Sequence, residues 1–216
     1  MKLKSFGFMN LLLALIFLCS SAMAADLTPL KLPSPQMDGG KPLMQALKDR
    51  MSSREYSDRK LSEQTLSNML WAAFGVSRAD GRRTAPSAKN WQEMDIYVVL
   101  PEGAYLWDHA KNVLNPVASG DIRGLTGTQA YVKDAAVNLV YVADYAKTAQ
   151  PGSLEADILT AADTGFISEN VYLFCASEGL GTVIRASIDR PALGKSLKLR
   201  PDQKITLSQS VGYPKK

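Results

Sequence analysis

The sequence of 216 residues contains one histidine and two cysteines, and this shortage excludes several chemistries. Zinc sites are built mainly from histidine and cysteine side chains, so His109 and Cys175 make a zinc site unexpected. A Ser-His-Asp hydrolase would need His109 as its base, but the sequence has no Gly-x-Ser-x-Gly nucleophile turn. We interpret His109 as a surface turn residue, and we expect no metal ion and no catalytic protein side chain.

The first 24 residues have the layout of a cleavable signal peptide. Lys2 and Lys4 precede an apolar run from Leu11 to Leu18, and small residues follow, ending at Ala24. A membrane anchor is the alternative, but eight apolar residues are far fewer than the roughly 20 that cross a bilayer as a helix. We therefore expect cleavage after Ala24 and a periplasmic or secreted protein with no stable membrane span.

Residues 25–216 are nearly neutral and contain a single cysteine. Loss of Lys2 and Lys4 leaves 23 basic and 21 acidic residues, without the basic patch that a nucleic-acid partner would require. Because Cys175 is then the only cysteine, no internal disulfide can form. A chain of 192 residues fits one domain, whose stability must come from its core and its subunit interface.

Proline and glycine separate an arm from the rest of the chain. Residues 25–42 contain four prolines and Gly39-Gly40, which cannot continue a helix or a central strand, so we interpret them as a linker or N-terminal arm. A short helix is expected over 41–50. Ser62 can cap a second helix that Gly75 ends, and its apolar residues recur every three or four positions, which indicates one face turned to a core.

The remaining chain contains both strands and helices. Residues 95–100 turn through Glu102-Gly103 into 105–107, which predicts a hairpin. The nearly continuous apolar run at 136–142 predicts a central strand covered on both faces. Residues 154–178 lack proline and repeat apolar residues at helical spacing, so we expect one helix of about 37 Å. Shorter elements are expected as helices around 121–134 and 191–197 and as strands at 182–188 and 205–211.

The predicted 154–178 helix is apolar around much of its circumference, which is typical of a helix in a core or a subunit interface. One domain of this size cannot readily cover so much apolar surface. The sequence therefore predicts a second copy of the chain as a partner, in a homodimer.

Three separated segments carry residues suited to binding a ligand. Arg50-Met51-Ser52-Ser53-Arg54 places two guanidinium groups and a hydroxyl together, which suits a phosphate and an electron-rich ring edge, although a solvated helix end is the commoner explanation. Residues 83–92 form a polar loop that leads into a strand and could present polar groups to a ligand or merely connect. Gly179-Leu180-Gly181-Thr182 lets the long helix turn tightly into a strand, as a helix C-cap does.

In this order and with these intervals, the three segments resemble the nitroreductase family of flavoproteins, especially its branch related to azoline-forming dehydrogenases. The resemblance extends from about Leu47 to Pro214. It implies an α+β (α/β) fold with a central mixed sheet flanked by helices, a long central helix, and FMN bound between the subunits of a dimer. The FMN-binding domain would span residues 43–216. Further matching segments are Leu61-Ser62, Leu70-Trp71-Ala72-Ala73, Ala85-Pro86-Ser87-Ala88, Asn170-Val171-Tyr172-Leu173 and Val211-Gly212-Tyr213-Pro214.

The resemblance assigns three residues of the first segment to the cofactor. It implies that Arg50 and Ser52 bind the FMN phosphate. It also implies that Arg54 lies beside the pyrimidine edge of the flavin, where a cation stabilises the negative charge of the reduced ring. The second segment matches the loop that contacts the isoalloxazine from the partner subunit, through Pro86, Ser87 and Asn90.

The strand after Gly181 matches the one that supplies backbone groups near the reactive N5 atom, here around Ala186 and Ser187. Relatives usually have small residues at this place, so Arg185 is a departure from the family pattern. A basic residue near the C-terminus often completes the phosphate site, and Lys215 or Lys216 matches that position.

The resemblance implies electron transfer from a reductant such as NAD(P)H through FMN to a small organic acceptor, with the flavin carrying the reaction. Export favours an alternative, because pyridine nucleotides are mainly cytosolic: a periplasmic flavin-binding electron-relay protein with an envelope redox partner and no NAD(P)H activity. A flavin-free binding domain, for example for a peptide, is a third possibility. Trp91, Tyr105 and Trp107 suit either a core or a lid, and we expect Trp107 in the core.

Overall fold

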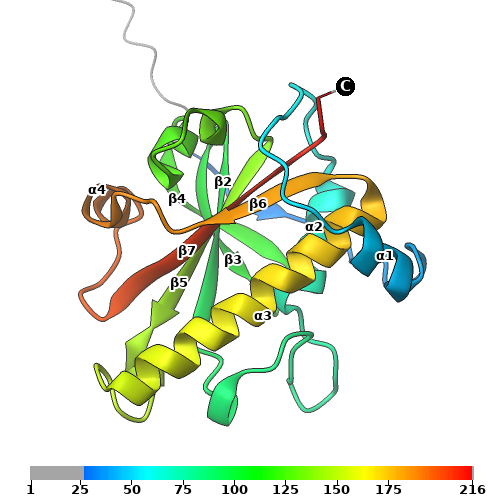
Figure 1. Cartoon of the computed structure of the whole chain (residues 1–216). Helices are drawn as coiled ribbons and strands as arrows, with labels where there is room; N and C mark the ends of the chain where they lie inside the picture. The colour runs from blue at the N-terminus through cyan, green and yellow to red at the C-terminus, as the bar shows by residue number, and fades with distance from the viewer. Residues whose placement is uncertain (1–26, 216) are drawn as a thin grey trace, which may run out of the picture.

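A computed structural model describes residues 27–215, so the predicted signal peptide, its cleavage after Ala24, and Lys216 lie outside the described residues. The described strands form one sheet in the order β1-β4-β3-β2-β5-β7-β6 (Figure 1). They are β1 (Leu30–Lys31), β2 (Met94–Leu100), β3 (Gly103–Asp108), β4 (Val113–Ser119), β5 (Val137–Asp144), β6 (Gly181–Arg185) and β7 (Gln203–Gly212). The α-helices are α1 (Leu43–Asp49), α2 (Glu63–Phe74), α3 (Leu154–Glu178) and α4 (Arg190–Ser196). Short 3-10 helices are η1 (Ala88–Asn90), η2 (Arg123–Thr126), η3 (Ala130–Lys133) and η4 (Tyr145–Lys147).

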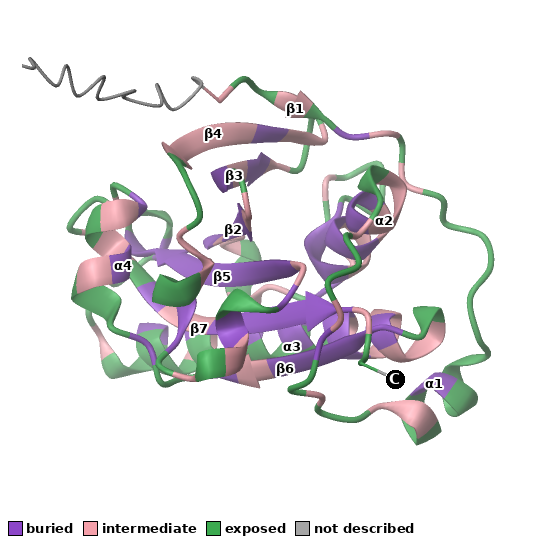
Figure 2. Ribbon diagram, turned by 90° about the horizontal axis from the view of Figure 1, so that it is seen from above, coloured by how far each residue is buried: buried purple, intermediate pink, exposed green. Residues whose placement is uncertain are grey.

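The sheet separates two hydrophobic cores, because alternate residues of a strand point to opposite faces. Leu139 and Tyr141 of β5 belong to the larger core, which α2 and α3 cover. Val140 and Val142 belong to the smaller core, which α4 covers from the other face. All residues of β5 are buried between these layers (Figure 2), which confirms the predicted central strand.

The predicted α+β fold, with helices flanking a central sheet and one long helix, is confirmed. The sheet that we expected to be mixed has antiparallel pairings between all of its named strands within residues 27–215. Consecutive strands β2, β3 and β4 are joined by tight turns, which require antiparallel neighbours. No helix in residues 27–215 combines the length and the apolar composition needed to cross a membrane.

The two principal helices begin and end where local chemistry predicts. The Ser62 side chain accepts a hydrogen bond from the Thr65 N–H at 3.0 Å and caps α2. Helix α3 spans the predicted 154–178, with Ser153 as its N-cap. Gly179 ends it with φ of 69°, a left-handed conformation that glycine adopts without a steric penalty.

Three elements differ from the sequence predictions. Strand β4 was not predicted, because Asn115 and Pro116 interrupt its apolar pattern; Pro116 is tolerated near the sheet edge, where β1 pairs only with the start of β4. The expected helical region at 121–134 consists of the short helices η2 and η3, which Gly127 separates. The expected strand 182–188 ends at Arg185, before Ala186 and Ser187.

Candidate functional site

The segment that follows α1 is held against α3 and β6 by one tyrosine. The guanidinium carbon of Arg50 lies 5.3 Å from the ring centre of Tyr172, which is on α3. The Tyr172 hydroxyl accepts a hydrogen bond from the Ile184 N–H of β6 at 3.0 Å, which leaves the phenol proton available for Ser52 Oγ, 2.9 Å away. Tyr172 therefore contacts both Arg50 and Ser52 and holds their side chains on the same part of α3.

A second contact brings the same segment close to the turn after α3. The Ser53 N–H donates to the Thr182 carbonyl at 2.8 Å. A Cβ atom on Gly181 would lie only 2.9 Å from Ser53 Oγ, so glycine allows this approach without displacing the Ser53 side chain. The Gly179–Thr182 segment is thus the predicted helix C-cap and also a contact surface for residues 50–54.

A basic hollow of about 560 Å³ opens beside these residues. Lys41, Lys48 and Arg50 contribute to its lining, together with Asp49. The hydrogen bond from Lys41 lowers the pKa of Asp49, which therefore stays ionised and offsets one of the three cations. The excess positive charge and the nearby Ser52 hydroxyl suit a phosphate group, which accepts charge-assisted hydrogen bonds.

The residues that the sequence assigned to the flavin ring outside the Pro86–Asn90 loop are exposed. Arg54 is exposed, and among residues 27–215 its guanidinium makes no hydrogen bond or ion pair. Ala186 and Ser187 are exposed directly after β6. The Ser187 carbonyl accepts a hydrogen bond from the Thr128 N–H at 3.0 Å, which ties this segment to the loop after η2.

The predicted Pro86–Asn90 loop lies near a different part of α3. Asp163 accepts a hydrogen bond from the Ala88 N–H at 2.8 Å, whereas Arg50 contacts Tyr172, nine residues further along the helix. Nine residues of α-helix correspond to about 14 Å. Pro86 and Asn90 are exposed and Ser87 is half-buried. One chain therefore does not bring this loop to Arg50 and Ser52.

Lys215 lies beside another hollow. Its N–H donates to the Glu55 carbonyl at 3.3 Å, and its side chain is exposed. It lines a hollow of about 540 Å³ together with Lys60 and Arg123. The preceding Pro214 lines the basic hollow beside Arg50, so the backbone of the C-terminal segment borders that site.

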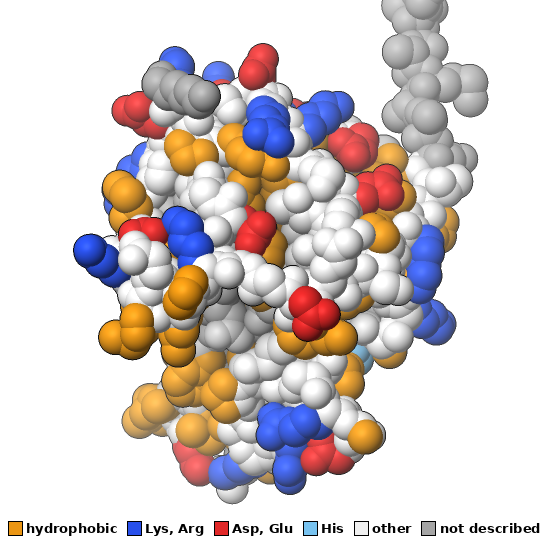
Figure 3. Space-filling model, turned by 90° about the vertical axis from the view of Figure 1, so that its right-hand side faces the viewer, with side chains coloured by type: hydrophobic (Ala, Val, Ile, Leu, Met, Phe, Trp, Pro, Cys, Tyr) orange, Lys and Arg blue, Asp and Glu red, His pale blue; other side chains and the backbone are white. Residues whose placement is uncertain are grey.

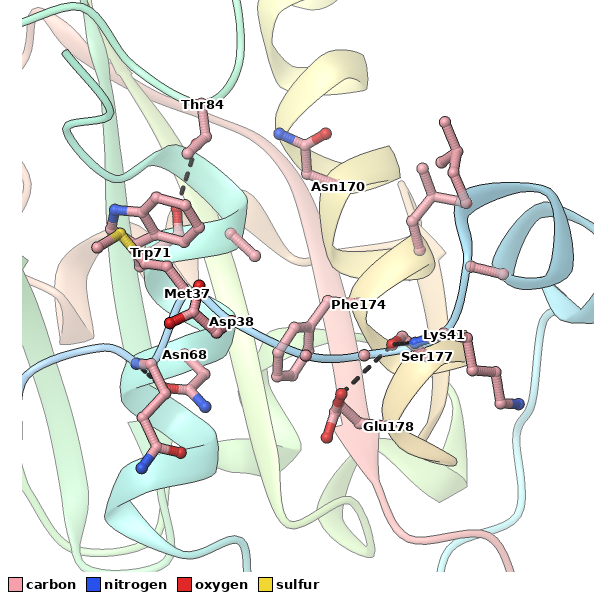
Figure 4. Close-up of a pocket in the computed structure, with 17 residues that line it drawn as sticks. Met37, Asp38, Lys41, Asn68, Trp71, Thr84, Asn170, Phe174, Ser177 and Glu178 are labelled. Carbon is pink, nitrogen blue, oxygen red and sulfur yellow. Dashed lines mark hydrogen bonds between the residues drawn. The ribbon is translucent and has the colours of Figure 1, made fainter.

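A further hollow, of about 460 Å³, adjoins the basic one, because Lys41 lines both. Figure 4 shows the arm around Met37 passing between Trp71 of α2 and Phe174 of α3. Asn170 adds an amide to this lining, so the hollow combines aromatic and polar groups and suits a small organic molecule.

The aromatic residues that were candidates for a lid belong to the core. Tyr105 and Trp107 are buried, which confirms the expectation for Trp107. Trp91 is half-buried and packs against the same core. His109 lies in the turn after β3, as predicted, and its Nε2 lies 2.7 Å from a guanidinium nitrogen of Arg83.

The nitroreductase family model matches residues 47–213. The chain belongs to the nitroreductase family. A Methanocaldococcus jannaschii protein that carries the name of a nitroreductase is 29% identical over 144 residues, covering 62% of this chain and 73% of that protein. A crystal structure described as a nitroreductase from Ralstonia eutropha JMP134 is 38% identical with a TM-score of 0.83, covering 87% of this chain and 90% of that chain.

More distant solved structures share the fold of this nitroreductase-family protein. The NADPH:FMN oxidoreductase from Vibrio harveyi, complexed with NAD+, has a TM-score of 0.59 at 21% identity, covering 81% of this chain and 69% of that chain. A chain of the Escherichia coli microcin synthetase complex has a TM-score of 0.67 at 18% identity, covering 89% of this chain and 80% of that chain. The family membership makes the protein an oxidoreductase by class.

Arg185, the departure from the nitroreductase pattern, is a buried cation in this family member. Its guanidinium donates to the carbonyl and hydroxyl oxygens of Thr126, to Asn138 Oδ1 and to Ser210 Oγ, over 2.6–3.2 Å. Burial lowers its pKa to about 10, so it stays protonated at neutral pH. Its partners are neutral, and a Cβ atom on Gly127 would collide with it. Arg185 therefore holds the end of η2 against the sheet.

We expect Arg185→Met to lower the free energy of unfolding by about 3 kcal/mol, because it removes the buried guanidinium hydrogen bonds and takes the donor from the hydroxyl oxygens of Thr126 and Ser210. Arg185→Lys keeps the charge but has fewer donors in a different geometry, so a smaller loss is expected. Urea unfolding measures both variants. Wild-type stability of Arg185→Met would contradict this account of the buried network.

Proposed function

We propose that this protein is an exported, FMN-dependent oxidoreductase that passes electrons from a reductant such as NAD(P)H to a small organic acceptor. The main support for this proposal is that Tyr172 holds Arg50 and Ser52 beside the basic hollow. Tyr172 thereby holds two polar side chains in one place, and within residues 27–215 the Arg50 guanidinium forms no ion pair. Such preorganisation favours binding of an anionic group.

The donor set fits the phosphate of FMN. Arg50 and Ser52 would hold it, and Lys41 and Lys48 would add positive charge at the same hollow. Arg54 is exposed and would lie by the pyrimidine edge, and the backbone of Ala186 and Ser187 would face the ring. When bound, FMN supplies the electron-accepting chemistry that the protein side chains lack.

Exposed apolar side chains and the position of the Pro86–Asn90 loop both support a homodimer as the functional form. The outer face of α3 exposes Leu154, Ile158 and Phe166, and α1 exposes further apolar side chains. Figure 3, which looks onto the side of the molecule where α1 lies, shows apolar side chains gathered there. A second copy would cover such surface, and it would let the Pro86–Asn90 loop of one subunit reach the FMN of the other.

The second hollow would receive the acceptor. Trp71 and Phe174 offer aromatic surfaces, Asn170 offers an amide, and Lys41 connects this hollow with the proposed phosphate site. NAD(P)H is proposed as donor because the Vibrio harveyi enzyme of the same fold is named for NADPH and FMN.

The predicted signal peptide favours one alternative: a periplasmic flavin-binding electron-relay protein that takes electrons from an envelope redox partner. The absorption spectrum of the purified protein tests for FMN. Anaerobic addition of NADH or NADPH then separates the two functions, because only an NAD(P)H-dependent oxidoreductase would have its bound flavin reduced, and so bleached, rapidly. A protein that stays colourless with added FMN refutes both.

N-terminal sequencing of the protein isolated from the cell envelope tests the predicted cleavage after Ala24.

Arg50→Ala and Arg54→Ala are expected to have different effects. Arg50→Ala removes a phosphate contact present in both redox states, so FMN should bind more weakly by about 1.5–3 kcal/mol with little change in potential. Arg54→Ala removes a cation that favours the reduced ring, so the midpoint potential should fall. FMN titration and potentiometry measure both properties. An unchanged potential in Arg54→Ala refutes its assigned role.

Ile158→Glu should convert the dimer to monomers, because it places a charge in the proposed apolar interface. FMN affinity should fall as well, since the loop from the partner would be lost. Leu125→Glu, on an exposed residue of η2, is the matched control and should leave the dimer intact. Light scattering measures the oligomeric state of both variants, and FMN titration measures their affinity. A dimeric Ile158→Glu variant would place the interface elsewhere.

A further inference from the structure

Two acidic side chains are buried together beneath the Pro86–Asn90 loop. Glu93, just before β2, is 0% exposed, and Asp163, on α3, is 1% exposed. Within residues 27–215 neither carboxyl group takes part in an ion pair, and Glu93 Oε1 has no hydrogen-bond partner. The nearby ionisable groups are Tyr145 of η4 and Asp157 of α3, which hydrogen-bond to each other. Among the residues that the structure describes, no basic group therefore neutralises either carboxyl group by an ion pair.

These carboxyl groups bind the loop at two consecutive residues. Asp163 Oδ2 accepts the Ala88 N–H at 2.8 Å, and the Ser87 hydroxyl lies 3.4 Å from Glu93 Oε2. Ser87 Oγ also accepts the Gln92 N–H at 2.8 Å, which closes the loop on itself.

The loop backbone needs such support. Lys89, Asn90 and Gln92 have φ values of 52°, 54° and 48°. This left-handed conformation costs roughly 1–2 kcal/mol per residue for side chains such as Lys89 and Gln92, and asparagine adopts it more readily. External hydrogen bonds must therefore hold the loop in its observed shape.

We propose that Glu93 and Asp163 share one proton and act as positioning residues, holding the Pro86–Asn90 loop in the shape that contacts the flavin of the partner subunit. This inference rests on the proposed function, and it makes protonation of the carboxyl pair a means of regulating the same site. Neither residue would touch the flavin; each would act through Ser87 and Ala88.

The proton belongs on Glu93. Asp163 accepts the Ala88 N–H and is best placed to carry the single negative charge, while a protonated Glu93 can donate to it. Burial, and then the charge of Asp163, raise the pKa of Glu93 above its ordinary value of 4.5. The stabilisation of the loop by this pair is therefore fully present below the ordinary pKa of Glu93. It is lost as the pH rises through the raised pKa, because two buried carboxylates would then face each other.

The test compares FMN affinity between about pH 5 and about pH 9, a range that includes values documented for buried glutamates. Wild-type affinity should fall towards alkaline pH. Glu93→Gln, which mimics the protonated residue, should remove this fall. Asp163→Ala should weaken FMN binding about tenfold at every pH, because the Ala88 N–H loses its acceptor. Asp163→Asn keeps an acceptor oxygen and should restore affinity.

Glu155→Gln is the matched control. Glu155 lies on the same helix and contacts the same loop through Lys89 at 2.7 Å, but this ion pair is exposed. Such pairs contribute little to stability. The variant should keep the wild-type affinity and its alkaline fall.

Hydrogen exchange at the Ala88 amide in flavin-free protein separates this inference from the proposed function. Asp163→Ala should speed exchange about tenfold. If the wild type binds no FMN but exchange responds this way, the proposed function fails while loop positioning stands. An alkaline fall that persists in Glu93→Gln, or exchange unchanged in Asp163→Ala, overturns the inference.

Discussion

The packing of α3 along the sheet holds both parts of the candidate site at a set separation. Tyr172 and Asp163 are on its buried side, and each contacts a segment distant in sequence. A helix rises 1.5 Å per residue, so the two contacts stay about 14 Å apart for as long as the helix is intact. The Ser153 cap and the left-handed Gly179 define its two ends. Residues 50–54 and 86–90 thus depend on one rigid element.

The buried charges of residues 27–215 are held in two ways: Asp144 pairs with Arg200, whereas Arg185 and Asp163 make no ion pair. Arg185 has only neutral partners, and Asp163 accepts from the Ala88 N–H close to the buried Glu93. A buried charge without an opposite charge is tolerated only when hydrogen bonds replace its lost hydration. These networks restrict the backbone more narrowly than apolar packing does, because a small displacement breaks a bond. The Pro86–Asn90 loop and the end of η2 are restrained in this way.

Local patterns were sufficient for the main elements and for much of the family resemblance. The apolar stripe of α2, the uninterrupted helical spacing of α3 and the apolar run of β5 predicted elements that the structure confirms. Strand β4 could not be predicted, because its pairing with β3 overrides the unfavourable residue Pro116. The role of Tyr172 was missed for a similar reason: its spacing marks it as a core residue, and the sequence does not show where its hydroxyl is directed.

The sequence alone determined the α+β class, the long helix, the family resemblance and the arginine-serine segment, because these depend on residue order over short spans. Only the tertiary structure decided which distant groups meet: Tyr172 with Ser52, Asp163 with Ala88, and Arg185 with Thr126. It also separated the loop at 86–90 from Arg50 within one chain. Such contacts depend on the register of strands and the rotation of a packed helix, which many residues set together and no short segment encodes.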